Sequence, residues 1–458
     1  MDTDSAGLNA TRMFARISQG TRTVRDLMAR ARDMATGSVG RRQATANSGW
    51  LLFERLTRTL LGLFVGAWVA RYLGPSELGE LAYVSAYVAL FLPIANLSAD
   101  AIIVRNISQE PKSAAVMLGS IMIMRLLLGM LCWILAVVSA ALIEGAPGRM
   151  TALTAIIGGS LVFQAADVVD LWFQSQAQSR RAVMARMLAY AISNGSKIVL
   201  ILNHAPLAAF AAVATLEGLV SAAALGVAYR RFKTSLPWRR SRQVALAVVS
   251  ECWPFMVSGF AIMLYMRVDQ IMVKELLGAH ELGIYAVALP ISQFWQVLPM
   301  TLATSIAPFI ARQRTIDPVA YRRSMVLTFR AFFYLGVATS LTTFIVSSWL
   351  INGLFGKAYL EAIGILDAHA LSNIFCFLGI AHGIWLVNER RFAVRLYGTV
   401  IAGAATIGLN MILLPMIGLL GACLAAITAQ AIAAFLVNAF LDRCSFRMQV
   451  EAITFRRI

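Results

Sequence analysis

Apolar runs of membrane-spanning length recur along almost the whole chain. A helix needs about 20 such residues to cross a hydrocarbon core that is about 30 Å thick. Only 14% of the residues are charged and 59% are hydrophobic, whereas a soluble domain carries roughly a quarter charged residues. The alternating apolar and polar pattern of a membrane β-barrel strand does not occur in these runs. The sequence therefore predicts an all-α polytopic membrane protein.

Hydropathy predicts about 12 transmembrane helices. They cover residues 48–72, 79–101, 114–143, 151–174, 184–203, 207–229, 245–276, 284–310, 326–351, 361–387, 394–416 and 418–441. The longest internal loop separates the first six helices from the last six. The predicted parts are a basic cytoplasmic tail (1–46), a first lobe with helices 1–6 (47–235), a cytoplasmic inter-lobe loop (236–244), a second lobe with helices 7–12 (245–442) and a cytoplasmic C-terminal tail (443–458).

The two groups of six helices resemble each other in sequence. A shift of 204 residues places the turn LGPSELG, residues 73–79, on the turn LGAHELG, residues 277–283. A weaker repeat pairs the double-arginine turn at 180–183 with that at 390–394, each between the fourth and fifth helices of its half. Because six is an even number, both halves have the same orientation in the membrane. The sequence thus predicts two parallel-repeat six-helix lobes around a central cavity, with the transport site between them.

Lysine and arginine residues predict the orientation. Of the 40 in the chain, 30 lie in the two tails and in alternate loops on one side, and four lie in the loops on the other side. Basic loops face the cytoplasm, so we expect both termini to be cytoplasmic and the protein to lie in an inner membrane, which the family resemblance given below implies is bacterial. The first 46 residues lack the apolar segment of a signal peptide. They are predicted to be a cytosolic tail, with binding of lipid headgroups as the alternative.

Several functional classes lack support in the sequence. The net charge of +17 comes without the aromatic-interleaved basic face that binds nucleic acid. The motifs of P-loop nucleotide hydrolysis, zinc proteases and serine hydrolases do not occur. The five cysteines and four histidines are scattered, which argues against a disulfide framework or a zinc site. We therefore predict no enzymatic activity, no catalytic residue, no cofactor and no metal.

Three stretches together resemble a known family. They are the run VARYLGPSELGELAYVSAYVALF (69–91) with DAIIVRNIS (100–108), the segment DLWFQSQAQSRRAVMA (170–185), and the segment from WPFMVSG to WQVLP (253–299). In combination they are similar to bacterial polysaccharide or O-antigen flippases. These flippases are the oligosaccharide branch of the multidrug, oligosaccharidyl-lipid and polysaccharide exporter superfamily. The resemblance extends from about residue 47 to the end of the chain.

This resemblance implies alternating access by two six-helix lobes. It further implies that the cargo is an undecaprenyl-diphosphate-linked oligosaccharide repeat unit for surface polysaccharide, and that the partners are the lipid bilayer and a polysaccharide polymerase or export machinery. In the stretch YMRVDQIM, Tyr265 and Asp269 are the only residues that we match directly to the pattern of the family. The alternative is a multidrug or organic-cation antiporter of the same fold, which an arginine-rich cavity disfavours.

Charged residues inside the predicted helices are the candidate site residues. A charge at the bilayer centre costs about 2.5–3.5 kcal/mol, so each needs a partner or a wet cavity. Arginine presents a planar fork of donors and lysine a compact charge, and both suit a diphosphate. The predicted cavity cations are Arg55, Arg58, Arg125, Lys197 and Arg267. The predicted carboxylates for ion coupling or charge pairing are Glu54, Asp167, Asp170, Glu217 and Asp269.

Two interpretations of these charges remain open. They either line a path for an anionic cargo or pair across helices and hold the lobes together. Glu54 lies four residues before Arg58 and on the same helix face, so it can neutralise one arginine of its helix. Most of the charges fall in the first half of the chain. We therefore expect the first lobe to supply most of the anion binding.

Overall fold

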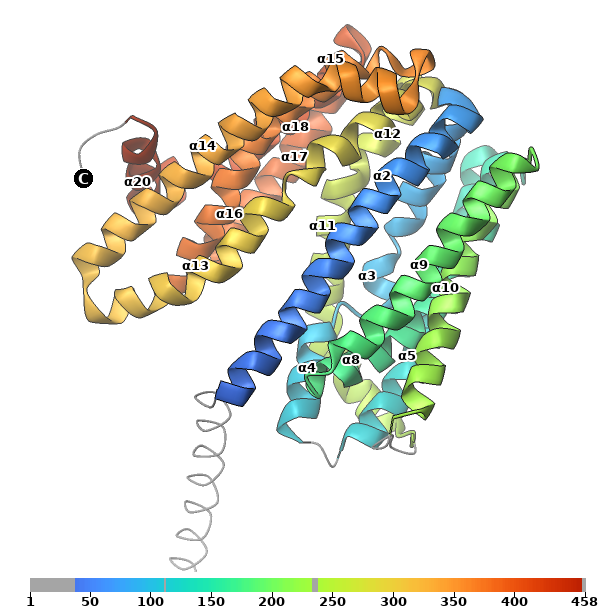
Figure 1. Ribbon diagram of the computed structural model, residues 1–458, viewed down its shortest axis with the longest axis horizontal. Coiled ribbons are helices and arrows are strands. Elements are labelled where there is room, and N and C mark those ends of the chain that lie inside the picture. Colours follow the sequence, from blue (N-terminus) through green and yellow to red (C-terminus); the bar gives the residue numbers. More distant parts are fainter. Residues whose placement is uncertain (1–37, 111–112, 233–237, 455–458) are drawn as a thin grey trace, which may run out of the picture.

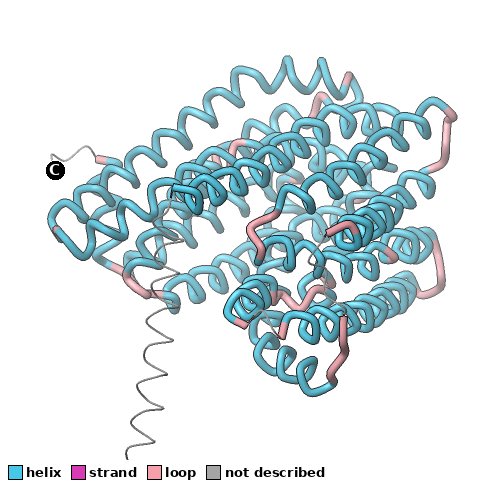
Figure 2. Tube along the Cα trace, turned by 60° about the horizontal axis from the view of Figure 1, so that its bottom comes forward, coloured by secondary structure: helices cyan, strands magenta, loops and turns pink. Residues whose placement is uncertain are grey.

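The computed structural model describes residues 38–110, 113–232 and 238–454. Most of the predicted basic tail therefore lies outside the described residues. All regular elements in the described part are helical (Figure 2). Ten helical segments there are long and apolar enough to cross a membrane. These observations confirm the predicted all-α polytopic fold.

The first lobe consists of the elements from α2 to α10. Their bounds are α2 (Ser38–Ala89), α3 (Leu92–Ala95), α4 (Asp100–Gln109), α5 (Ala114–Glu144), α6 (Arg149–Gly158), α7 (Ser160–Phe163), η1 (Gln164–Asp167), α8 (Val168–Ser175), α9 (Ser179–Leu202) and α10 (Leu207–Arg230). Within α2 the helix is broken at Gly74, where φ is 72° and ψ is 172°. Glycine adopts this left-handed φ without the steric cost that a side chain would add.

The second lobe consists of the elements from α11 to α20. Their bounds are α11 (Arg242–Leu277), α12 (Ala279–Phe294), α13 (Val297–Ile316), α14 (Pro318–Leu350), η2 (Ile351–Phe355), η3 (Lys357–Tyr359), α15 (Ala362–Ala370), α16 (Ser372–Asn388), α17 (Phe392–Ile417), α18 (Leu419–Ala431), η4 (Ile432–Leu436), α19 (Val437–Leu441) and α20 (Arg443–Ile453). The helix α20 lies in the predicted C-terminal tail. It packs against α14 through two contacts of 2.6 and 2.8 Å between Arg322 and Glu451.

The ten apolar segments are consistent with the twelve predicted spans. The first segment, Gly49–Gln109, contains the first two spans and the break at Gly74. The predicted fifth span corresponds to α9, which is 24 residues long but is not among the ten. Arg186, Asn194 and Lys197 lower its mean hydropathy. Polar side chains on one face of α9 therefore lower its mean hydropathy below that of the ten segments, although the helix is long enough to cross the membrane.

The two repeated turns contact each other at one end of the molecule, where the lobes meet and α2 and α12 lie side by side (Figure 1). A Cβ atom added to Gly79 would lie 1.7 Å from the carbonyl oxygen of Ala279. A Cβ atom added to Gly283 would lie 1.9 Å from the carbonyl oxygen of Pro75. Both pairs are related by the same shift of 204 residues. The same close contact is thus made twice, as expected for two parallel repeats.

The lobes converge at this contact and separate toward the opposite end (Figure 1). We call the end with the repeated turns the turn end, and the end with the junctions α8–α9, α10–α11 and α16–α17 the basic end. At the turn end, Tyr359 Oη donates to the carbonyl oxygen of Ala70 at 2.8 Å, and Arg71 Nη2 donates to that of Gly353 at 2.5 Å. These two bonds connect α2 to the second lobe.

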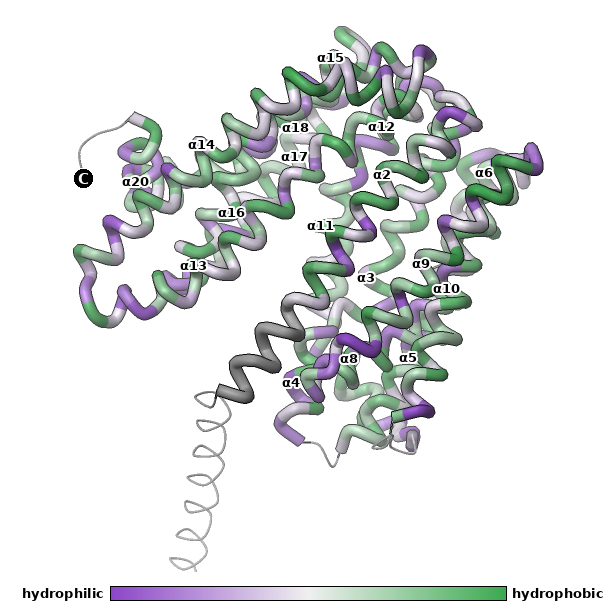
Figure 3. The backbone as a smooth tube through the Cα atoms, viewed as in Figure 1, coloured by the Kyte–Doolittle hydropathy of each residue, from purple (hydrophilic) through white to green (hydrophobic). Residues whose placement is uncertain are grey.

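Hydropathy along the backbone follows this division (Figure 3). Hydrophilic segments gather around α4 and α8 near the basic end, while long stretches of α5, α10 and α14 are apolar. The first part of α11 returns to the first lobe at the basic end. There the backbone N–H of Arg239 donates to Ala115 O at 3.1 Å, and that of Ser241 donates to Ser120 Oγ at 2.9 Å.

The contact between the turns predicts the effect of adding a methyl group. Gly79→Ala and Gly283→Ala should each destabilise the protein, because the new Cβ meets backbone that cannot move aside. Overpacking of this kind costs about 1–3 kcal/mol. The thermal midpoint of unfolding in detergent measures the effect. Gly226→Ala is the matched control, because its Cβ would meet nothing within 4 Å. Equal midpoints for all three variants would contradict the account of the contact.

Candidate functional site

The largest described cavity lies on the second lobe and faces the first. It has a volume of about 730 Å³. Its wall comes from α11, α13, α16, α17, α18 and η4, and Arg55 of α2 enters from the first lobe. The charged side chains in this wall are Arg55 and Arg395, and the wall contains no aspartate or glutamate. The polar groups include Tyr265, His382 and Gln430. The cavity is therefore suited to an anion.

The two arginines approach the cavity from different lobes. The Arg55 guanidinium crosses from α2 and lies 3.1 Å from Met300 Sδ of α13. Arg395 lies in the first turn of α17 and is exposed. Neither arginine makes an ion pair with any residue that the structure describes. Arg395 was predicted only as a basic loop residue. Its position just inside the start of the predicted eleventh span, 394–416, was the sequence feature that could have indicated a place in the cavity wall.

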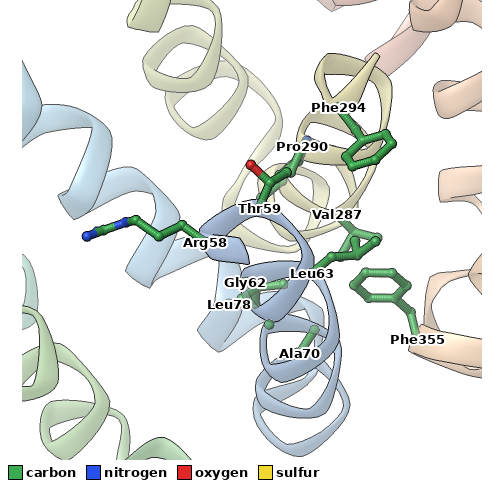
Figure 4. A pocket seen from close by; sticks show the side chains of 12 residues that line it. Arg58, Thr59, Gly62, Leu63, Ala70, Leu78, Val287, Pro290, Phe294 and Phe355 are labelled. Atoms are coloured by element: carbon green, nitrogen blue, oxygen red, sulfur yellow. The ribbon is translucent and has the colours of Figure 1, made fainter. Parts of the chain in front are cut away.

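A second cavity of about 370 Å³ lies between α2 and α12 and is lined mainly by apolar side chains. Arg58 contributes to its wall, but Figure 4 shows its guanidinium directed away from Val287, Phe294 and Phe355. The guanidinium instead contacts Glu217 Oε1 of α10 at 2.8 Å. It also lies 4.5 Å from the centre of the Tyr190 ring on α9.

These contacts correct one expectation for Arg58. The neutralisation by Glu54 within the same helix does not occur, because Glu217 and Tyr190 of neighbouring helices surround the guanidinium. Lys197, two turns after Tyr190 on α9, lies near the same Glu217 carboxylate. The predicted residues Arg58, Lys197 and Glu217 therefore come together inside the first lobe. This cluster is separate from the larger cavity.

Glu54 belongs to a different charge network. Its two carboxylate oxygens accept from Arg186 Nε and Nη2 of α9 at 2.7 and 2.6 Å. Arg186 Nη1 also contacts Asp170 of α8, which accepts from Gln174 at 2.9 Å. Glu54 and Asp170 are each 8% exposed. Arg186 is one of the 30 basic residues counted on the cytoplasmic side, although it lies within the predicted fifth span, 184–203. It thus connects three helices, and its depth within α9 was the sequence feature that could have indicated this.

Arg125 also has a structural partner. Its side chain is 1% exposed and contacts Asp100 Oδ1 of α4 at 2.5 Å. It lies in the wall of none of the cavities described above. In this structure the Arg125 guanidinium is buried between α4 and α5, and its predicted role in the cavity remains a prediction. Asp167, on η1 between this pair and Asp170, makes no ion pair with any described residue.

The predicted charges of the second lobe have separate environments. The Asp269 carboxylate accepts from Tyr285 Oη at 2.7 Å and from the backbone N–H of Gln270 at 2.8 Å. Arg267 Nη1 lies 3.5 Å from Gln270 Oε1. Tyr265, one turn earlier on α11, lines the larger cavity, whereas Arg267 and Asp269 do not. Among the described residues, no group of three histidine, cysteine or carboxylate side chains could hold a metal ion.

The comparisons with known proteins agree with this architecture. The sequence model of a family described as polysaccharide biosynthesis protein matches residues 44–313, which is more than half of the chain. The chain belongs to this family. The comparison with curated protein sequences gives no significant match.

Solved structures with the same fold include two transporters of the MOP superfamily and a lipid II flippase. The inward-facing structure of a multidrug resistance MATE family transporter of the MOP superfamily has a TM-score of 0.66 and is 16% identical, covering 89% of this chain and 100% of that one. The lipid II flippase MurJ, in an inward closed conformation, has a TM-score of 0.67 and 14% identity, covering 88% and 90%. A MOP superfamily transporter from Pyrococcus furiosus has a TM-score of 0.60 and 16% identity, covering 90% and 95%.

The charge network around Arg186 predicts a large loss of stability on its removal. Arg186→Met leaves the buried carboxylates of Glu54 and Asp170 without their cation, and breaking such a pair costs about 3–5 kcal/mol. The thermal midpoint of unfolding in detergent measures the loss. The control is Arg149→Met, because Arg149 is 55% exposed and pairs with Glu77 and Glu80 at the surface, where pairs contribute at most about 1 kcal/mol.

A charge-free network provides the second arm of this test. The triple variant Glu54→Gln, Asp170→Asn and Arg186→Met leaves no buried charge without a partner, so it should regain part of the stability that Arg186→Met loses. If Arg186→Met unfolds at the same temperature as Arg149→Met, the three-helix network does not stabilise the first lobe.

Proposed function

We propose that this protein is a flippase that moves a polyprenyl-diphosphate-linked oligosaccharide across the bacterial cytoplasmic membrane for surface polysaccharide synthesis. The observation that carries the proposal is the larger cavity between the lobes. Its wall contains two arginines without ion-pair partners among the described residues, and no carboxylate. Arginine is suited to diphosphate because its planar fork donates two parallel hydrogen bonds to phosphate oxygens and stays charged.

An apolar pocket suits the lipid part of such a cargo. It has a volume of about 300 Å³ and lies between α2, α12 and α14. Its wall is almost entirely apolar, with Leu63 and Phe294 also lining the cavity beside Arg58. An anionic headgroup in the larger cavity and a hydrocarbon tail between the lobes would each occupy a matching environment.

The arrangement of the lobes supports an alternating-access mechanism. The lobes are joined at the turn end by the glycine contacts and by the bonds from Tyr359 and Arg71. The larger cavity reaches toward the basic end, where Asn388 and Arg395 line it. If the basic end is cytoplasmic, as the distribution of lysine and arginine predicts, this conformation receives cargo from inside. Rocking of one lobe against the other would then expose the cargo outside.

The alternative is a multidrug or organic-cation exporter. Solved structures of MATE transporters and of the MurJ flippase share this fold, and a fold alone does not decide function. A cationic cargo would favour carboxylates in the cavity, and the larger cavity has none. The family description, polysaccharide biosynthesis protein, also favours the flippase.

Deletion with complementation tests the proposed function. Loss of surface polysaccharide, with lipid-linked oligosaccharide accumulating in the inner leaflet, is expected on deletion and should be reversed by the intact gene. The measurements are the polysaccharide yield and the amount of lipid-linked intermediate. Unchanged polysaccharide together with increased sensitivity to cationic dyes would favour the exporter instead.

A further inference from the structure

The last helix, α20, folds back along the outer side of the second lobe, away from the first lobe (Figure 1). The Gln449 side chain donates to the carbonyl oxygen of Ala434 in η4 at 3.0 Å, and the centres of the Phe446 and Phe435 rings lie 4.9 Å apart. Ala434 and Phe435 belong to the predicted twelfth span, 418–441. Helix α20 therefore returns alongside a membrane-spanning helix and does not extend away from it.

The C-terminal end of α20 lies at the level where α14 enters the membrane. Arg330 of α14 belongs to the predicted ninth span, 326–351. Its Nε donates to the carbonyl oxygen of Ala452 and its Nη2 to that of Glu451, both at 3.2 Å. Arg322, which lies about two turns earlier on α14 and just outside the span, contacts the Glu451 carboxylate at 2.6 Å. The boundary of the membrane thus passes along α20.

The side chains of α20 form three sides of the helix. The buried side packs on the second lobe and consists of Ser445, Met448, Gln449 and Ala452. A partly exposed apolar side consists of Phe446, Val450 and Ile453. Arg443 and Arg447 are exposed, and at about 100° per residue they lie opposite the lobe and next to the apolar side. A helix of this kind can place its apolar side among acyl chains and its arginines among headgroups.

The charge of the two exposed arginines is available to a ligand. Arg443 and Arg447 are four residues apart, so they share one face of the helix. Neither makes an ion pair with any residue that the structure describes. The acidic residues at the two ends of α20 are already occupied, because Asp442 pairs with Arg391 and Glu451 pairs with Arg322. The exposed side of α20 is therefore suited to an anion.

We propose that α20 is an interfacial helix whose Arg443 and Arg447 bind the headgroups of anionic phospholipids. The leaflet is the one at the basic end, which the distribution of lysine and arginine predicts to be cytoplasmic. An anionic phospholipid matches both free sides of α20 at once, because its phosphate meets the arginines where its acyl chains meet the apolar side. This surface is separate from the cavity between the lobes, and the inference goes beyond the proposed function.

The position of α20 also affects the wall of the larger cavity. Ala434 lines this cavity and lies in η4, a π-helical turn of the last span. Its carbonyl oxygen accepts from Gln449 of α20 at 3.0 Å and from Asn438 at 2.8 Å. Short π-helical turns are frequent at functional sites. Lipid that keeps α20 docked therefore also keeps this carbonyl and the wall beside it in place.

Hydrogen–deuterium exchange of the full chain in nanodiscs tests the lipid contact. The two bilayers are phosphatidylcholine alone and phosphatidylcholine mixed with phosphatidylglycerol. Phosphatidylglycerol should slow the exchange of α20 amides about 25-fold, because each of two arginines at an anionic surface contributes about fivefold. Peptides that cover η4 should show slowing in the same bilayer.

Two double variants locate the effect. Arg443→Gln with Arg447→Gln should remove the slowing. Arg230→Gln with Arg231→Gln is the matched control and should keep it, because these two arginines are exposed at the basic end of the first lobe. Both double variants should have the thermal midpoint of the parent in phosphatidylcholine, since exposed substitutions of this kind change stability little.

The depth of α20 is measured with a bimane label in a variant whose five cysteines are replaced by alanine. The label is attached at Val450→Cys, on the apolar side of α20. A nitroxide near the headgroup end of the acyl chains should quench this bimane more strongly than aqueous iodide does. The matched label at Thr315→Cys, on the exposed end of α13, should show the reverse order.

Three results would overturn the inference. Equal exchange of the α20 amides in the two bilayers, or undiminished slowing in Arg443→Gln with Arg447→Gln, excludes the lipid site at these arginines. Stronger quenching of the label at position 450 by iodide places α20 in water. Slowing by inorganic phosphate in phosphatidylcholine alone assigns the arginines to a soluble anion. The identity of the cargo does not enter these measurements.

Discussion

Contact between two short turns organises this protein. Residues 73–79 and 277–283 carry nearly the same sequence, and each places its last glycine against a backbone carbonyl of the other. Because backbone meets backbone, the two lobes approach more closely here than side chains would permit. The shift of 204 residues converts each half of the contact into the other half, so the contact lies on the axis that relates the two repeats. The lobes therefore share a fixed point at the turn end and lie farther apart toward the basic end, where the larger cavity lies, although the start of α11 stays with the first lobe there.

The charges within the membrane divide into two groups with different roles. In the first lobe, Glu54, Asp170 and Arg186 satisfy one another, as do Arg125 with Asp100 and Arg58 with Glu217. These pairs offset the desolvation of their members and connect neighbouring helices. Arg55 and Arg395 make no ion pair with any described residue and face the cavity. A cation that the protein leaves without a counter-ion is available to an anionic ligand, so the proposed site draws more on the second lobe than the sequence analysis expected.

The sequence predicted the helices better than it predicted the site. Membrane spans follow from local hydropathy, and the repeat follows from direct comparison of residues. The two-lobe fold could therefore be predicted from the sequence, and it is confirmed. Ion pairs depend on which helices are neighbours, which spacing along one helix does not reveal. Glu54 was therefore expected to neutralise one arginine of its own helix, although Arg186 of another helix binds it. Arg186 and Arg395 were counted as loop residues because each lies within one or two turns of a helix start. The roles assigned to the predicted site residues remain predictions.

The central claim is that the lobes move a lipid-linked diphosphate between the two leaflets. Reconstitution into liposomes that contain a fluorescent undecaprenyl-diphosphate sugar tests this claim most directly, with a membrane-impermeant quencher that reports the outer leaflet alone. Half of the fluorescence is protected when lipids do not cross. The account predicts that the protected fraction falls rapidly in proteoliposomes, and that Arg395→Gln, which removes a cation from the cavity wall, slows the fall. A protected fraction equal to that of empty liposomes, with transport of tetraphenylphosphonium by the same vesicles, would contradict the account.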